Sequence, residues 1–202
     1  MAVLHGRHLH VRRRNGAVRE AVRPAVDRRR RQGVQPVGGR SLVDDEAIEI
    51  QRQRIRDAFL RGGGVQSSAR GVHHVVLLSS NVERTVRFYQ DTLGFPLTEI
   101  FENRDYRGSS HFFFDLGNGN LLAFFDFPGL DLGTYAEVLG GLHHVAISME
   151  PEQWEQARQR LDDTGVEYRR ESGTSIYFKD PDGARIELIA DPLGEMYGAE
   201  IL

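Results

Sequence analysis

Over the first 40 positions, apolar and polar residues follow neither a helical nor a strand period. A short pattern begins after that, where Ile48, Ile55 and Phe59 form a narrow apolar stripe at helical spacing. Acidic residues precede this stripe and arginines follow it, as suits the dipole of a helix. We therefore predict a short helix near residues 44–61, followed by a flexible linker that begins at Gly62–Gly64.

From residue 71 onward the chain contains an internal repeat. The sequence Gly71-Val-His-His-Val-Val-Leu-Leu78 returns 70 residues later as Gly141-Leu-His-His-Val-Ala-Ile-Ser148. Each copy begins with a strand-like apolar run, continues with an amphipathic helix that ends at Gly94 or Gly165, and then holds three strand candidates. The six candidates are Leu97–Asn103, Ser110–Leu116, Leu121–Phe127, Val166–Arg170, Thr174–Lys179 and Arg185–Ala190.

This order of elements predicts an α+β protein made of two tandem βαβββ modules. Module one is expected at residues 71–128 and module two at residues 141–196, so that the domain spans residues 71–196. Neither module, at about 60 residues, buries a good core alone, and we therefore expect the two to pack around a shared cavity. Residues 1–64 form a separate N-terminal extension.

Charge divides the chain at nearly the same place. Residues 1–70 hold 16 arginines and 7 acidic residues, whereas residues 71–202 hold 10 basic and 22 acidic residues. The basic extension lacks interleaved aromatic residues that could stack on bases, so we predict a disordered segment rather than a nucleic-acid-binding one. The chain has no cysteine, which excludes disulfides and thiolate metal sites. No apolar run is long enough for a membrane span and no targeting signal is evident, which predicts a cytoplasmic protein without membrane partners.

Histidine and glutamate are the residues that could carry chemistry. Adjacent side chains in a strand point to opposite faces, so only one member of each His-His pair can face the shared cavity. Glu187 lies among Ile and Leu in the last strand candidate, where an unpaired charge would be costly. Two histidines and one carboxylate form a three-ligand set that leaves coordination positions open, as in non-haem Fe(II) oxygenases and catalytic zinc sites.

Two segments resemble a known superfamily. The segment from His74 to Gly94 resembles the opening of a vicinal-oxygen-chelate module, and Asp180-Pro-Asp-Gly-Ala-Arg-Ile-Glu-Leu188 resembles its closing strand. This superfamily contains glyoxalase I, fosfomycin-resistance enzymes, bleomycin-binding proteins and extradiol ring-cleaving dioxygenases. The resemblance implies paired βαβββ modules that form an open metal-binding barrel.

The same resemblance implies which residues bind the metal. His74, His144 and Glu187 occupy the ligand positions, and His73 and His143 would face the other way. Fe(II) is the favoured metal, with Mn, Zn or Ni as alternatives.

The resemblance also ranks the activities. Ala123 stands where glyoxalase I has a second carboxylate, which makes that activity less favoured. Tyr177 matches the tyrosine of the extradiol signature that hydrogen-bonds a bound catechol, although the histidine of that signature is missing from residues 168–170. His111 is the one free substitute for the acid–base histidine expected in module one. Tyr177 and His111 are thus the candidate catalytic residues, with a core aromatic and a structural histidine as the alternatives.

We therefore expect a metal-dependent enzyme that acts on a small molecule with vicinal oxygens and is most similar to extradiol dioxygenases. A lyase or thiol transferase similar to glyoxalase or fosfomycin-resistance enzymes is one alternative. A non-catalytic binding protein similar to bleomycin-resistance proteins is another. The sequence leaves a homodimer open.

Overall fold

The computed structural model describes residues 45–60 and 67–201. The chain divides into two units, residues 1–60 and 61–202. In the first unit the described element is helix α1, Asp45–Phe59, where the sequence predicts a short helix. The disorder predicted for the start of the extension concerns residues outside the described ones. None of the described helices is long and apolar enough to cross a membrane.

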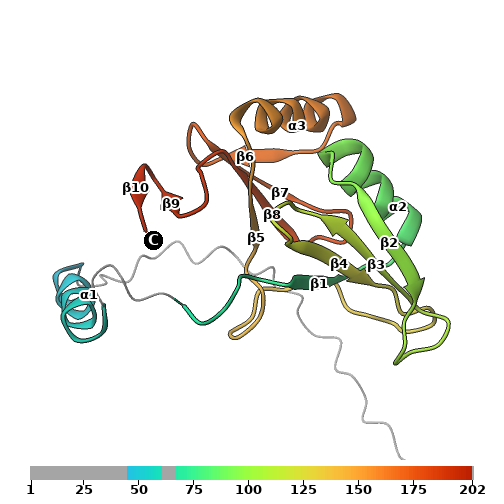
Figure 1. Ribbon diagram of the computed structural model, residues 1–202, viewed down its shortest axis with the longest axis horizontal. Coiled ribbons are helices and arrows are strands. Elements are labelled where there is room, and N and C mark those ends of the chain that lie inside the picture. Colours follow the sequence, from blue (N-terminus) through green and yellow to red (C-terminus); the bar gives the residue numbers. More distant parts are fainter. Residues whose placement is uncertain (1–44, 61–66, 202) are drawn as a thin grey trace, which may run out of the picture. The chain divides into compact units, whose positions relative to one another are not determined.

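The second unit contains one βαβββ pattern twice, which confirms the predicted fold class (Figure 1). Module one consists of β1 (His74–Leu78), α2 (Val82–Val86), the π-helical turn η1 (Arg87–Leu93), β2 (Leu97–Glu102), β3 (Ser110–Asp115) and β4 (Leu121–Phe125). Module two consists of β5 (Val145–Ser148), α3 (Pro151–Thr164), β6 (Tyr168–Arg170), β7 (Ser175–Lys179) and β8 (Arg185–Ile189). A two-stranded hairpin follows, made of β9 (Glu195–Met196) and β10 (Ala199–Glu200).

Each module forms its own four-stranded sheet with the same topology. The strand orders are β1-β4-β3-β2 and β5-β8-β7-β6, so the first strand of each module pairs with the last one. That pairing is parallel in both sheets, and the other pairings are antiparallel. In the described part of the chain the two sheets are not hydrogen-bonded to each other, and no closed barrel is formed.

One face of each sheet is covered by helices, and these covered faces share a single core. Tyr89 of η1 packs against Phe124 of its own sheet, with ring centroids 4.9 Å apart. Trp154 of α3 packs on the other sheet and donates its Nε1 hydrogen to the Leu188 carbonyl at 2.9 Å. Helices η1 and α3 also contact each other. The ring centroid of Phe88 in η1 lies 6.0 Å from that of Phe178 in the second sheet. The uncovered faces of the two sheets therefore look away from this common core.

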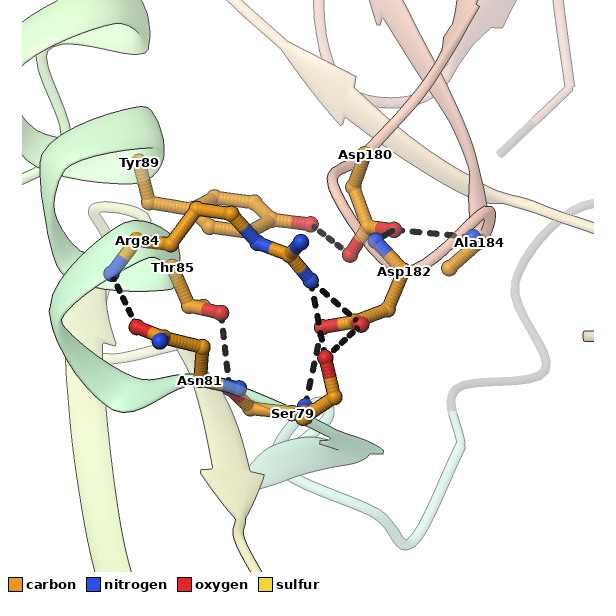
Figure 2. Close-up of polar contacts among 9 residues, drawn as sticks. Ser79, Asn81, Arg84, Thr85, Tyr89, Asp180, Asp182 and Ala184 are labelled. Carbon is orange, nitrogen blue, oxygen red and sulfur yellow. Dashed lines mark hydrogen bonds and ion pairs between the residues drawn. The ribbon is translucent and has the colours of Figure 1, made fainter. Parts of the chain in front are cut away.

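A polar clip joins the two modules at the turn between β7 and β8 (Figure 2). The Asp182 carboxylate accepts hydrogen bonds from the backbone N–H and the hydroxyl of Ser80, at 3.1 and 2.5 Å. It also accepts one from the Arg84 guanidinium at 2.7 Å. Beside it, the buried Tyr89 hydroxyl donates to Asp180 at 3.1 Å, and burial raises the pKa of Asp180. The Asp-Pro-Asp-Gly sequence thus forms a hairpin turn and also fixes module two against α2.

Because Asp182 accepts these hydrogen bonds, we expect its replacement to lower the stability of the protein measurably. Asp182→Ala removes the acceptor of three hydrogen bonds, two from Ser80 and one from Arg84, and we expect the free energy of unfolding to fall by about 1–2 kcal/mol. Denaturant titration of the full chain measures this change. Asp163→Ala, at an exposed site on α3, is the control, with an expected change within about 0.5 kcal/mol. Equal effects of both substitutions would show that the clip contributes nothing.

Candidate metal centre

The strand register places a row of polar side chains on the open face of module two. Tyr177 lies opposite Glu187, and Lys179 lies opposite Arg185. Residues two apart along a strand share a face, so Ser175 lies on this face as well. The alternate residues Ile176, Phe178, Ile186 and Leu188 are buried on the helix-covered side. A wide pocket of about 970 Å³ lies over the polar face.

Two of the three predicted metal ligands meet on this face. Nε2 of His144 lies 3.2 Å from Oε2 of Glu187, whose side chain is only 6% exposed. The other carboxylate oxygen, Oε1, accepts a hydrogen bond from the Ser175 hydroxyl at 2.5 Å. Two ligands about 2.1 Å from one ion and at right angles to each other are about 3.0 Å apart. The His144–Glu187 pair therefore has the spacing of neighbouring ligands on one metal ion.

Polar contacts from neighbouring residues hold His144 in place. Nη1 of Arg185 lies 3.1 Å from Nε2 of His143, and Nδ1 of His143 lies 2.7 Å from Nδ1 of His144. Nε2 of His144 is directed at Glu187. A metal ion held between these two residues would take Nε2 of His144 as its ligand, and the neutral ring would then carry its hydrogen on Nδ1. Glu137, from the segment between the modules, forms an ion pair with Arg185 and completes this support.

Tyr177 lies beside both of these ligands. Its ring centroid is 5.4 Å from that of His144. Burial raises the pKa of Tyr177 to about 12, with a hydrogen bond to Glu187 as the second cause. Tyr177 therefore keeps its proton at neutral pH and can donate a hydrogen bond at this face.

The third predicted ligand, His74, lies at the start of β1 on the open face of the other sheet. Its ring neighbours there are His111, at a centroid distance of 6.3 Å, and Phe113, at 6.2 Å. In the described part of the chain, no group of three or more His, Asp or Glu side chains is arranged to hold one metal ion. The structure thus brings His144 and Glu187 together and leaves His74 apart from them.

His111 has an aromatic environment. Its ring lies 4.1 Å from that of Phe113 and 4.2 Å from that of Phe125. Its Nε2 atom is buried without a hydrogen-bond partner among the described residues. Burial, and secondarily the charge of His74, lowers the pKa of His111, so the ring is neutral at pH 7. The catalytic role of His111 stays a prediction, and in this structure its Nε2 does not face the solvent.

The two open faces occupy equivalent positions but differ in chemistry. In module two, Ala146, Glu187 and Tyr177 lie side by side on adjacent strands. The equivalent residues in module one are Val76, Ala123 and Phe113. The rest of the module-one face is also largely apolar, with Leu78, Phe101, Leu121 and Phe125 on it. Ala123 is therefore the structural counterpart of Glu187, as the sequence count predicts.

The His-His pairs differ from the prediction in one respect. Strands β1 and β5 begin at His74 and Val145, so His73, His143 and His144 lie just before the regular pleat. Strand alternation does not apply there. In each pair the two rings approach each other, with Nδ1 atoms 2.8 Å apart for His73 and His74. The expectation that the first member of each pair faces away from the second is wrong, because both rings lie at the edge of the sheet.

Sequence reasoning did not identify three supporting residues: Ser175, Arg185 and Glu137. Ser175 could have been found from strand parity, since it lies two residues before Tyr177. Glu137 could not, because it lies in the irregular segment between the modules, for which a sequence pattern gives no spatial position.

The sequence is similar to those of two proteins whose names describe enzymes. The chain is 29% identical over 140 residues to "Putative ring-cleaving dioxygenase MhqA" of Bacillus subtilis, a match that covers 65% of this chain and 43% of MhqA. It is also 29% identical over 132 residues to "Metallothiol transferase FosB" of Shouchella clausii, covering 62% of this chain and 83% of FosB. The chain thus spans less than half the length of the dioxygenase relative. These relatives are named as enzymes.

Solved structures agree on the fold. A glyoxylase/bleomycin resistance protein/dioxygenase domain from Frankia superposes with a TM-score of 0.53 at 22% identity, over 62% of this chain and all of the Frankia chain. The sequence profile of the Glyoxalase/Bleomycin resistance protein/Dioxygenase superfamily matches residues 71–188, which include both modules and all three predicted ligands. The chain belongs to this superfamily.

Proposed function

We propose that this protein is a divalent-metal enzyme that acts on an aromatic molecule with two vicinal oxygens, in the manner of a ring-cleaving dioxygenase. The observation that carries the proposal is the His144–Glu187 pair at ligand spacing, with Tyr177 opposite Glu187 on the neighbouring strand and beside the His144 ring. Fe(II) is the proposed metal, because two histidines and one carboxylate are the ligand set of non-haem iron oxygenases.

The third ligand, His74, is proposed to come from a second copy of the chain. The open faces of one chain look away from their shared core, so His74 cannot complete the site of its own chain without breaking that core. If the module-one face of each copy covers the module-two face of the other, two equivalent sites form across a twofold axis. Each would contain His74 of one copy and His144 and Glu187 of the other.

The substrate class follows from the chemistry of the two faces. Phe101, Phe113 and Phe125 form an aromatic surface around His111 on module one. Phe101 is 48% exposed, so this apolar surface is available for contact. A flat ring packs well on such a surface, whereas its two oxygens would be directed toward the polar face with Glu187. An aromatic diol would contact both faces, with its ring on the aromatic surface and its oxygens toward Glu187.

Each residue has a distinct part in this proposal. The metal would act as a Lewis acid and a template for the two oxygens. Ser175 holds Oε1 of Glu187, which leaves Oε2 free for the metal. Tyr177 holds its proton at the hydroxyl oxygen and would donate a hydrogen bond to a substrate oxygen. The buried apolar residues beneath the strands keep these groups in place.

A second candidate is transfer of a thiol to a small anionic substrate. Lys179 and Arg185 line the same pocket as Glu187, and their charges would suit an anion. The similarity to FosB extends over 83% of that protein. The aromatic face of module one has no evident part in such a reaction, which is why we rank it second.

Replacing the Tyr177 hydroxyl tests the proposed function. Tyr177→Phe removes only the oxygen, and we expect turnover to fall about tenfold to a thousandfold while metal affinity changes only a few-fold. The full chain is supplied with Fe(II) without oxygen and offered a panel of catechols, and dioxygen is then added. Yellow ring-cleavage products are followed by absorbance.

The matched control is Tyr106→Phe, because the Tyr106 hydroxyl has no hydrogen-bond partner among the described residues and lies in the loop between β2 and β3. Turnover of Tyr106→Phe should equal that of the wild type. An inactive wild type across the whole panel would end the dioxygenase proposal, and thiol-plus-epoxide substrates would be tested next. Full activity in Tyr177→Phe would remove Tyr177 from the site.

A further inference from the structure

The hairpin after β8 places a tyrosine where its backbone is poorly suited. Strands β9 and β10 pair with Met196 opposite Ala199, so Tyr197 and Gly198 are the two central residues of the turn. Both have positive φ angles, 55° and 75°. Such a two-residue hairpin turn favours Asn-Gly, Asp-Gly or Gly-Gly, since a bulky side chain in the left-handed region clashes with its own backbone. Tyr197 therefore costs stability at this position.

The turn holds this conformation through specific contacts. The backbone N–H of Tyr197 donates to the Asp191 carboxylate at 3.1 Å. The backbone N–H of Ile201 donates to the Gly194 carbonyl at 2.8 Å and closes the base of the hairpin. The Tyr197 side chain itself is 83% exposed, so burial of its ring does not offset the backbone cost.

The exposed ring lies at the pocket of the candidate metal centre. Tyr197 lines the same 970 Å³ pocket as Ser175, Tyr177 and Glu187. In Figure 1 a short loop, residues 190–194, joins the hairpin to β8, the strand that carries Glu187. An aromatic side chain with a phenol group thus stands at the pocket without contributing to the core.

Strained backbone conformations are concentrated at active sites and ligand clamps. We infer that Tyr197 is a substrate-contacting residue that packs its ring on the aromatic ring of the bound diol and so sets the specificity for aromatic substrates. This inference rests on the proposed function, because the ring of the diol is the group that Tyr197 contacts. It differs from the role of Tyr177, which acts on a substrate oxygen.

The inference predicts opposite effects on stability and on binding from one substitution. Tyr197→Asn gives the turn its preferred Asn-Gly sequence, and we expect the melting temperature to rise by about 1–4 °C. The same substitution should weaken binding of 4-nitrocatechol about tenfold, because the ring contact is lost. Tyr197→Phe keeps the ring and should bind within about threefold of the wild type. Binding is measured by the absorbance of 4-nitrocatechol on the Fe(II)-containing full chain without oxygen, and melting by calorimetry.

Tyr106→Asn serves as the control for loss of a tyrosine outside the pocket and should leave 4-nitrocatechol binding unchanged. Unchanged binding in Tyr197→Asn, with a wild type that binds, would overturn this inference and leave the proposed function intact. A lower melting temperature together with weaker binding would assign Tyr197 a structural role and also overturn it. A wild type that binds no 4-nitrocatechol would overturn the proposed function and this inference together.

Discussion

Glu187→Ala is expected to weaken metal binding by more than about a hundredfold, since loss of a direct ligand exceeds the effect of losing an outer-shell contact. His144→Ala should have a similar effect, because the two side chains are proposed to bind the same ion. Metal content is measured by mass spectrometry of protein purified without chelators or affinity-tag metals, and affinity by calorimetric titration. Glu167→Ala is the matched control, since Glu167 is a carboxylate of the same pocket that has no contact with His144. Normal metal content in Glu187→Ala would place the site elsewhere.

His143→Ala should have an intermediate effect. His143 contacts Nδ1 of His144 and links it to Arg185, so its loss frees the ring of a proposed ligand without removing the ligand. An outer-shell partner of this kind contributes about tenfold to a hundredfold to metal affinity. The sequence alone predicts no effect, because strand alternation would direct His143 away. Equal losses in His143→Ala and His144→Ala would mean that His143 is itself a ligand.

The second large effect is expected when two inactive variants are combined. His74→Ala and Glu187→Ala should each lose metal binding as pure proteins. A heterodimer of the two has one intact site, with His74 from the Glu187→Ala chain and His144 and Glu187 from the His74→Ala chain. After random pairing by joint refolding or co-expression, about a quarter of the wild-type metal sites should return.

The combination of His144→Ala with Glu187→Ala is a matched control for this experiment. Both substitutions lie on the same face, so every site of the mixed dimer lacks one ligand and no metal binding should return. If metal binding returns when Glu187→Ala is combined with His74→Ala, but not when it is combined with His144→Ala, the site must be shared between two copies. If neither combination recovers metal, the three ligands do not come from two chains in this way.

The fold could be predicted closely because its signals are local and occur twice. The strand candidate Leu97–Asn103 corresponds to β2 at Leu97–Glu102, and Thr174–Lys179 corresponds to β7 at Ser175–Lys179. Both predicted helix ends hold, with Gly94 and Gly165 in the left-handed conformation at φ angles of 86° and 70°. Each of these features depends on residues close together in the chain.

The site could be predicted only in part, because its assembly depends on how the modules pack. The pairing of His144 with Glu187 follows from adjacent strands, which a sequence repeat can reveal. The separation of His74 from them does not, because it results from contacts such as Phe88 with Phe178 and Arg84 with Asp182. These contacts join the helix-covered sides of the modules, and neither pair has a recognisable sequence signal.

The unequal open faces have a consequence for how a molecule can be oriented. A dimer of identical single modules would present the same face from both sides, so that a bound molecule could lie in either of two equivalent directions. Here duplication has separated the two halves: Glu187 and Tyr177 stand on one face, and Ala123 and Phe113 stand in their places on the other. Under the proposed function, a molecule with a polar edge and a flat apolar body would then bind in a single orientation, and the asymmetry of the duplicated modules would decide which of its bonds reacts.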